Sequence, residues 1–501
     1  MFRINLVKTG VNATNGHILP AGPKGPVSRY DGWLKLKSRI ATDAAVAGLA
    51  IAVFAAFGLW GAGQGYAPDG DSVRLFDSAR TILEGGYERS RSSGYPAFEA
   101  FIALILWLGG GVRAVGIAVL VMWLATATVL ARLARPGNRL LVPAAFLLTP
   151  VILTNASWQM ETAQAALLAS VYLLFFLESR IRFRFVCMGL TGVLLMLTRI
   201  DACFAIVALA AAGLVAERDW RHAAVVVFVG AVSFGVYVGL NDGLSFLGPF
   251  EEANDSIFRY IAKSMVIVYV VMAFTGFAMV ISVLLRWGQL RPLLRWAFAF
   301  MAVAWAARII MHPEEPEYLV IPYVFLLAAF VSQPQSLRGT HLLALALVSN
   351  LFTPIFFELP DTARDSHRLT LAVGSPPVWQ DIERRIAYNT ALEDETVEFI
   401  RAQSGIDVVS SPFHDWLMNA QGDEIVIFSD ALFVFRTQRL TSFSFVDLSQ
   451  YKRIVVCEGR RIPTRGWRWL RRLGLPHVNE AMKTGKPLAC RATGASRIQA
   501  R

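Results

Sequence analysis

Acidic and basic side chains that could act on a phosphate ester gather in one early polar stretch of the chain, YAPDGDSVRLFDSARTILEGGYERSRSSGYP (66–96). Asp69 and Asp71 form a D-x-D pair, and Arg89 and Arg91 follow in the same stretch. A carboxylate can accept a proton from a hydroxyl group, and a guanidinium can hold two phosphate oxygens through parallel hydrogen bonds. Because apolar segments flank the stretch, this combination favours a phosphate-bearing substrate that lies at a membrane face.

Further ionisable residues stand where later apolar runs end. A charge at membrane depth is costly, so such a residue usually has a partner or a substrate. We take Asp71 and Asp69 as the catalytic candidates. The candidates for substrate binding are Arg89, Arg91, Tyr95, Glu161, Arg199, Asp201, Arg308 and His312.

Each candidate also has a structural interpretation. Apolar residues recur at helical spacing from Val73 onward, which places Asp71 where a helix N-cap belongs. Glu161 would likewise cap the helix that starts beside it, and Arg199 with Asp201 would form an ion pair at a helix turn. The residues alone leave both interpretations open.

The composition places the chain among polytopic membrane proteins. Hydrophobic residues make up 55% of the 501 and charged residues 17%, with a mean hydropathy of +0.48. A soluble core could not hide so much apolar surface. The net charge of +11 reflects arginines in short loops between apolar runs, which indicates membrane topology and excludes nucleic-acid binding. The four cysteines show no CxxC or Cys/His spacing and so predict no metal site.

Basic residues before the first apolar segment predict its orientation. Lys35, Lys37 and Arg39 precede the segment 44–63, so we expect residues 1–43 to be a cytoplasmic amino-terminal segment. The first helix then runs outward. The polar stretch that follows it therefore lies outside the cytoplasm.

The next apolar piece, PAFEAFIALILWL (96–108), decides the rest of the path. Its 13 residues carry Glu99 and would reach only about 20 Å as a helix, too short to span a membrane. We predict an interfacial helix within an external loop, 64–112. The arginine-rich loops at 132–139, 178–184, 217–222 and 286–295 then all lie on the cytoplasmic side, and acidic loops lie outside.

The predicted architecture is an α-helical membrane domain, 44–357, followed by a small external α/β domain, 358–501. Beyond the first span, ten more would bring the total to about eleven, near 113–131, 140–155, 161–177, 185–198, 201–216, 223–240, 263–285, 296–311, 318–332 and 341–357. In the tail, GIDVVSS, DEIVIFSD and RIVVCEG predict strands, with helical patterns near 381–403 and 465–473.

The order of the motifs resembles the glycosyltransferase-C superfamily, which includes aminoarabinose transferases, protein O-mannosyltransferases and polyprenyl-phosphate-sugar transferases. PDGDSVRLFDSARTILEGGYERSRSSGYPAFEAF (68–101) is similar to their first external loop. In that loop an acid precedes an amphipathic helix, and a basic residue and a Gly/Pro turn lead into an interfacial helix. The resemblance therefore implies the same topology as the charge distribution.

Three later segments continue the resemblance. LLTPVILTNASWQMETAQAALL (147–168) looks like the second external loop, with Glu161 at the position of its acid. LLMLTRIDACF (194–204) is similar to a segment that carries a Lys or Arg, often followed by Pro-Asp, although Ile200 replaces the proline here. ARIIMHPEEPEYLVIPYVFLL (307–327) resembles a late loop that enters an aromatic-proline span.

The resemblance implies transfer of a sugar from a polyprenyl-phosphate donor to a lipid, glycan or protein acceptor at the external face of the cell (inner) membrane. Asp71 would be the base of an inverting displacement, and Arg91 and Arg199 would hold the donor phosphate. Asp69 or Glu161 would position the acceptor. In members of the superfamily that use a divalent cation such as Mg or Mn, these acids would share it with Asp71.

Two other functional classes fit parts of the sequence. A transporter or flippase of a lipid-linked substrate would also need intramembrane arginines and acids. Against it, the polar residues concentrate on one face, and no paired, Gly/Pro-broken repeat is present in the sequence. A noncatalytic scaffold whose tail recruits a partner would leave the acids of the external loop unexplained.

The predicted topology can be tested by thiol labelling from outside the cell. A single cysteine at Arg135 or Arg291 should resist a membrane-impermeant reagent, whereas one at Asp255 should react. Labelling at Arg135 would show that 96–111 crosses the membrane, and the prediction of a single external site would then be wrong.

Overall fold

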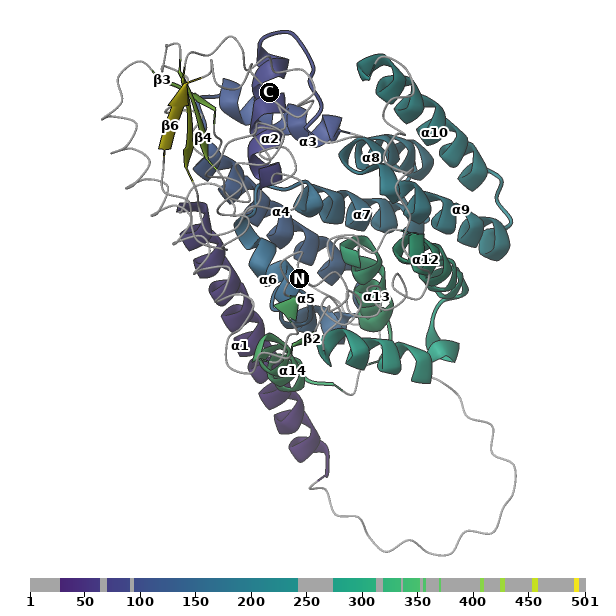
Figure 1. The fold of residues 1–501 in the computed structure, drawn as a ribbon. Coiled ribbons are helices and arrows are strands. Elements are labelled where there is room, and N and C mark those ends of the chain that lie inside the picture. Colours follow the sequence, from purple (N-terminus) through teal and green to yellow (C-terminus); the bar gives the residue numbers. More distant parts are fainter. Residues whose placement is uncertain are drawn as a thin grey trace, which may run out of the picture.

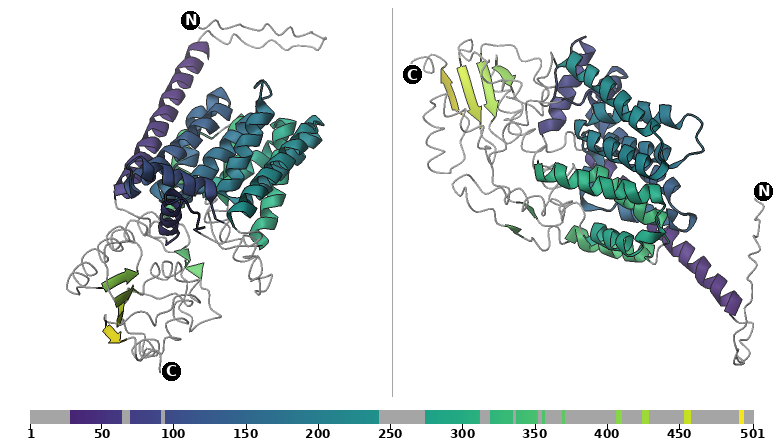
Figure 2. Two further views of the ribbon diagram at one scale, coloured as in Figure 1. Left: turned by 90° about the horizontal axis from the view of Figure 1, so that it is seen from above. Right: turned by 90° about the vertical axis from the view of Figure 1, so that its right-hand side faces the viewer.

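In the computed structural model, the described residues are 28–63, 70–90, 94–241, 274–311, 319–334 and 337–351, together with six short strands further along the chain. Within these ranges the chain forms a bundle of helices, and α1 extends beyond it at its amino-terminal end (Figure 1, Figure 2). The longer helices are α1 (Ser28–Gly63), α4 (Val112–Leu133), α7 (Thr162–Leu177), α8 (Arg184–Thr198), α9 (Cys203–Glu217), α10 (Arg221–Leu240), α12 (Pro292–Met311), α13 (Val320–Ser332) and α14 (Gly339–Leu351).

Several of these helices have the length and composition of membrane spans. Among the described residues, four helices are by themselves long and apolar enough to cross a membrane: Lys37–Gly63 within α1, α4, Ile200–Glu217 and α10. The bent pair Pro136–Phe146 and Pro150–Ser157 would be a fifth if it counts as one span, and the other apolar helices have 10–17 residues. The chain is therefore a polytopic helical membrane protein, as its composition predicts. The total of about eleven spans stays a prediction.

The segment predicted as a span at 140–155 is not one continuous helix. The segment is divided into η1 (Pro136–Leu141), α5 (Val142–Phe146), α6 (Pro150–Thr154) and η2 (Asn155–Ser157), with a bend of 66° between the two halves. Pro150 is the first residue of α6. Because proline has no N–H and its ring clashes with the preceding turn, the helix cannot continue straight through it.

Aromatic side chains fill the centre of the bundle, where α4, α7 and α13 pack together. Trp123, Phe146 and Tyr323 form a chain of ring contacts with centroids 5.9 and 6.4 Å apart. The Tyr323 hydroxyl donates to the Ala145 carbonyl at 2.8 Å, and the Trp123 indole donates to the Asn155 carbonyl at 3.0 Å. The bond from Tyr323 satisfies a carbonyl just before the bend, and the bond from Trp123 adds a second donor to a carbonyl that also accepts the Trp158 N–H.

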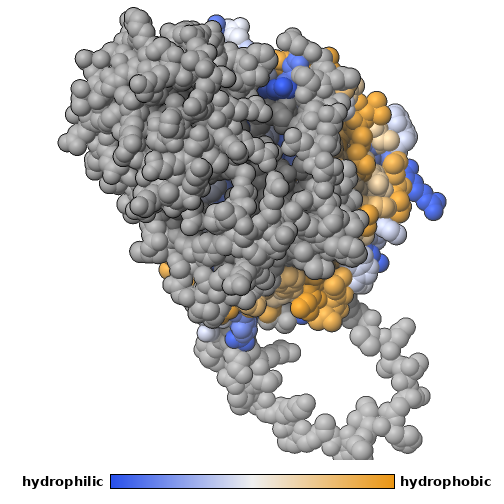
Figure 3. Space-filling model, in the orientation of Figure 1, coloured by the Kyte–Doolittle hydropathy of each residue, from blue (hydrophilic) through white to orange (hydrophobic). Residues whose placement is uncertain are grey.

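The outward faces of the helices are apolar, as a lipid environment requires. Val186 on α8 and Val227 on α10 are exposed, and apolar surface covers the coloured flank of the bundle in Figure 3. Small residues let neighbouring helices approach closely. A Cβ at Gly192 would lie only 2.8 Å from a methyl carbon of Val229, so glycine is needed where α8 meets α10.

The helix predicted after Asp71 is present as α2 (Gly70–Leu83). Its buried face contains Phe76 and Ala79. Because α2 begins at Gly70, Asp71 lies within the first turn, and the N-cap position predicted for it is wrong. An acidic residue in the first turn is still favoured by the partial positive charge of the helix N-terminus.

The apolar piece predicted to be interfacial forms α3 (Pro96–Trp107), which packs against α2. Its 12 residues reach about 18 Å, less than the hydrocarbon thickness of a bilayer. Pro96 at the first position fits the helix start, where a missing N–H has no consequence. Together α2 and α3 form most of the predicted external loop.

The strands predicted in the tail are present as β3 (Ile406–Val409), β4 (Glu424–Phe428) and β5 (Arg453–Cys457). They pair in parallel in that order, and β6 (Arg491–Gly494) adds an antiparallel edge to β5. A separate pair joins β1 (Ile355–Phe356) to β2 (Leu369–Thr370). The helices predicted near 381–403 and 465–473 lie outside the described residues, so the α/β domain as a unit stays a prediction.

Asp43 links α1 to the start of α14 and provides a test of the fold. Its buried carboxylate accepts the Gly339 N–H at 2.7 Å and lies 3.7 Å from the Arg39 guanidinium. Asp43→Ala leaves that N–H without its acceptor, so the free energy of unfolding in detergent should fall by about 1–3 kcal/mol. Thr42→Ala is the control, because Thr42 is exposed and donates within its own helix. Equal stability of the two variants would contradict the role of Asp43.

Candidate functional site

Three of the predicted site residues meet in one buried ion cluster. The Arg199 guanidinium donates to Asp201 through Nε at 3.0 Å and Nη2 at 3.2 Å, and to Glu161 through Nη1 at 3.0 Å. The exposed fractions of the side chains are 3% for Arg199, 1% for Glu161 and 8% for Asp201. Glu161 and Arg199 are 38 residues apart in the chain, and the packing of α7 against α8 brings them together.

The cluster lies where α7 begins and where the chain turns from α8 into α9. Arg199 follows the last residue of α8 with an extended backbone (φ −151°, ψ 118°), and η3 (Ile200–Ala202) leads into α9. A cation after the end of one helix and an acid before the start of the next both stand where helix dipoles favour them. The local sequence therefore supports the turn as well as the ion pair.

The geometry decides between the two interpretations of these residues. Glu161 occupies the N-cap position of α7, yet its side chain makes no capping hydrogen bond and binds Arg199. Arg199 and Asp201 do form the pair that the structural interpretation expects. Because Asp201 takes both Nε and Nη2, that edge of the guanidinium is not open to two oxygens of a phosphate.

Two tyrosines and a second arginine lie near the cluster. Tyr95, buried at the start of α3, is an electrostatic neighbour of the cluster arginine. Tyr237, in the last turn of α10, lies within electrostatic range of the cluster aspartate. Arg308, in the last turn of α12, is an electrostatic neighbour of Cys203 at the start of α9. The predicted residues Tyr95 and Arg308 thus lie at the same end of the bundle as the cluster.

Glu99 is a polar residue of this region that sequence reasoning missed as part of the site. It is fully buried in the first turn of α3. Its carboxylate accepts hydrogen bonds from the Tyr87 hydroxyl at 2.7 Å, from the Ser90 amide at 3.0 Å and from the Ser90 hydroxyl. Burial raises the pKa of Glu99, and the bonds from Ser90 and Tyr87 oppose the rise. The available signal was a single acid within an otherwise apolar helix.

The remaining candidates belong to the external loops. Arg89 is exposed, and its Nη1 lies 3.5 Å from the Asn241 amide oxygen at the end of α10. Asp69, Arg91 and His312 lie outside the described residues, as does the side chain of Asp71. The placement of the catalytic acids relative to the cluster therefore stays a prediction.

The predicted divalent cation finds no support in the described part of the chain. There, no group of three His, Cys, Asp or Glu side chains is arranged to hold a metal ion. Glu161, one of the three acids named for this role, is bound by the cationic guanidinium of Arg199. Asp69 and the side chain of Asp71, the other two acids, lie outside the described residues, so the cation stays a prediction.

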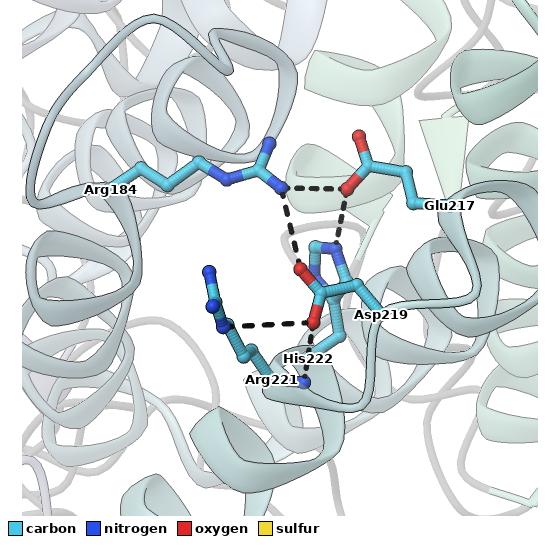
Figure 4. A network of polar contacts seen from close by, with 5 residues as sticks. All are labelled: Arg184, Glu217, Asp219, Arg221 and His222. Carbon is cyan, nitrogen blue, oxygen red and sulfur yellow. Dashed lines mark hydrogen bonds and ion pairs between the residues drawn. The ribbon is translucent and has the colours of Figure 1, made fainter.

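A second polar network lies at the opposite end of α8, about 22 Å along the helix from the cluster (Figure 4). Arg184 lies 2.7 Å from Glu217 and 4.0 Å from Asp219, Arg221 lies 4.0 Å from Asp219, and His222 Nε2 lies 2.9 Å from Glu217. These contacts tie the α9–α10 connection to the start of α8. The network thus lies apart from the candidate site, with the length of α8 between them.

The ion cluster predicts a large stability effect of Arg199. Arg199→Met leaves two carboxylates buried without their guanidinium, so the free energy of unfolding in detergent should fall by about 3–5 kcal/mol. Adding Glu161→Gln and Asp201→Asn to this variant should recover part of the loss, because it removes the uncompensated charges.

Arg221→Met is the matched control for this measurement. Arg221 is 63% exposed in its ion pair with Asp219, and such pairs contribute about 0–1 kcal/mol. If Arg199→Met were no less stable than Arg221→Met, the cluster would not be held together by its charges.

Comparison with known proteins identifies the fold. No protein-family model matches the chain, and no curated protein matches it. It is similar to crystal structures of ArnT from Cupriavidus metallidurans in the apo state (13% identity, TM-score 0.49) and bound to undecaprenyl phosphate (14% identity, TM-score 0.51). Each comparison covers 93% of this chain and 98% of that chain. The chain therefore shares the overall fold of ArnT in its complex with undecaprenyl phosphate.

Proposed function

We propose that the chain is a membrane glycosyltransferase that moves a sugar from a polyprenyl-phosphate-linked donor to a lipid, glycan or protein acceptor. The observation that carries the proposal is the buried cluster of Arg199, Glu161 and Asp201 at the end of the bundle where the first loop packs. Ionisable groups buried at such a position are typical of substrate sites. The likeness to ArnT, seen with undecaprenyl phosphate bound, supports a lipid-phosphate carrier.

The proposed active site faces the external side of the cell (inner) membrane. Residues 1–43 would lie in the cytoplasm, 44–357 would form about eleven spans, and 358–501 would form an external α/β domain. The distribution of arginines over the loops supports this orientation.

The proposed reaction is a single displacement at the anomeric carbon. The acceptor hydroxyl gives its proton to Asp71, its oxygen bonds to the anomeric carbon, and the bond from that carbon to the phosphate oxygen breaks. The polyprenyl phosphate leaves with the electron pair and needs no general acid when cations hold its charge. Attack opposite the leaving group inverts the configuration.

For the donor phosphate we propose the arginines of the loops. Arg89 and Arg91 come from the first external loop, and Arg308 is the arginine of α12 near the cluster. Arg199 is surrounded by two acids, so we assign it the role of orienting Glu161 and Asp201 and no bidentate phosphate contact. Tyr95, Asp69 and His312 would complete the substrate site.

The reaction class can be tested with membranes that contain the protein and labelled polyprenyl-phosphate sugars. A transferase should move the label from the lipid carrier to an acceptor, and membranes without the protein should not. Label that crosses the membrane while it stays attached to the carrier would instead identify a flippase and overturn the proposal.

Asp71→Asn tests the base. Asparagine keeps the size of the side chain and removes its negative charge and its ability to accept the proton. We expect normal expression and a drop of roughly a hundredfold or more in transfer rate, because general base catalysis contributes about that much. Asp69→Asn in parallel shows which acid of the pair matters.

Glu84→Gln is the control for this substitution, since Glu84 is an exposed acid of the same loop. It should transfer at the wild-type rate. Wild-type transfer by Asp71→Asn would remove Asp71 from the mechanism and shift the role to Asp69 or Glu161.

A further inference from the structure

We propose that Glu99 is a positioning residue whose buried carboxylate clamps the loop Tyr87–Ser90 and thereby places Arg89 for donor binding. This inference rests on the proposed function, because it assigns the arginine of the clamped loop to the donor phosphate. Glu99 itself would touch no substrate.

The hydrogen bonds of Glu99 account for the clamp. One carboxylate oxygen accepts from the Tyr87 hydroxyl, and the other accepts from both the amide and the hydroxyl of Ser90. An ionised carboxylate is acceptor-only and can serve all three donors at once. Burial raises the pKa of Tyr87, so its hydroxyl stays protonated and remains a donor. The two ends of the segment 87–90 are therefore held by a single side chain.

Arg89 lies between the two clamped residues. Its guanidinium reaches toward the Asn241 amide oxygen at 3.5 Å, so the clamped segment lies beside the end of α10. Gly94 is shaped for this arrangement: its φ of +71° favours glycine, and a Cβ there would collide with the Tyr87 hydroxyl. The turn after the loop thus leaves room for the hydrogen bond that closes the clamp.

The clamp and the ion cluster share neighbours. The Tyr237 hydroxyl lies within electrostatic range of both Glu99 and Asp201, and Tyr95, at the start of the same helix as Glu99, is an electrostatic neighbour of Arg199. The helix that carries Glu99 also packs against α8, which leads into Arg199. Holding the loop on α3 therefore holds Arg89 at the end of the bundle where the cluster lies.

Burying a carboxylate in this helix carries a large desolvation cost. The rest of α3, PAFEAFIALILW, contains no other charged residue, and burying an acid costs more than burying an apolar side chain of similar size. Hydrogen bonds from the loop donors offset that cost, and those donors need an acceptor at this position. An acid at this position is therefore best explained by what it does to the loop.

Glu99→Gln in the full-length protein tests the proposal. Glutamine has one acceptor oxygen, and its NH₂ group faces one of the donors that the carboxylate served. Because the loop arginine binds the donor phosphate and holds the charge that grows on it as the carrier leaves, KM for the polyprenyl-phosphate sugar should rise and kcat/KM should fall about tenfold. Gly94→Ala should raise KM in the same direction without any change of charge.

A measurement that needs no activity accompanies the kinetics. Hydrogen exchange of the Ser90 amide should speed up about tenfold in Glu99→Leu, because leucine offers that amide no acceptor. Glu84→Gln, a matched change at an exposed acid of the same loop, should alter neither exchange nor KM.

The outcomes separate the clamp from the proposed function. Unchanged exchange at Ser90 in Glu99→Leu would overturn the clamp, and faster exchange with unchanged KM and kcat/KM would overturn its role in donor binding. A lower yield of folded protein with unchanged kcat/KM per folded molecule would indicate a merely structural residue. If the wild-type protein used no polyprenyl-phosphate sugar, the proposed function would fail, and the exchange measurement would still decide the clamp.

Discussion

A guanidinium held between two carboxylates, all three out of contact with water, is the interaction on which the rest of the polar structure depends. Arg199 engages Glu161 at the start of α7 and Asp201 before α9. Removing such charges from water costs several kcal/mol each, and only close pairing in good geometry offsets the cost. The ends of these helices therefore cannot separate without exposing an uncompensated buried charge, and this requirement holds the candidate site in one arrangement.

The same requirement is met differently by Glu99, which has no cation within hydrogen-bond distance among the described residues. Its carboxylate is satisfied by neutral donors from one loop, so its burial orders that loop. The buried carboxylate of Glu161, in contrast, joins two helices through Arg199. The bundle supplies the rigid background for both, because its centre is filled by aromatic contacts between α4, the bent segment and α13. The proposed site thus lies at helix ends and in a loop, and the packed interior supports both.

The ion pairs at the two ends of α8 differ in burial and therefore in their contribution to stability. At one end Arg199 is 3% exposed, and at the other Arg221 is 63% exposed in its pair with Asp219. Exposed pairs are screened by water and contribute little to stability, whereas a buried group that loses its partner destabilises the protein strongly. The exposed pair of Arg221 with Asp219 in Figure 4 should therefore tolerate substitution, whereas the buried cluster should not.

The sequence by itself determined the class of protein and most element positions. Hydropathy and charge are local properties, so runs such as 113–131 and 223–240 predict α4 and α10 closely, and β-branched runs predict β3, β4 and β5. The same local view also explains the errors. Hydropathy does not register the bend at Pro150 within 140–155, and the sequence pattern started α2 too late because helix ends are only weakly marked.

Only the tertiary structure decided which charges meet. The sequence already offered Arg199 and Asp201 as an ion pair at a helix turn, but the pairing of Arg199 with Glu161 depends on how α7 packs against α8. That pairing is the reason why we propose that Arg199 orients two carboxylates and makes no bidentate phosphate contact. Glu99 gained its proposed role in the same way, since its partners Tyr87 and Ser90 are visible only once the loop is folded back on α3. Interaction energies between charges and hydrogen-bonding groups depend on distance in space, and distance along the chain does not supply it.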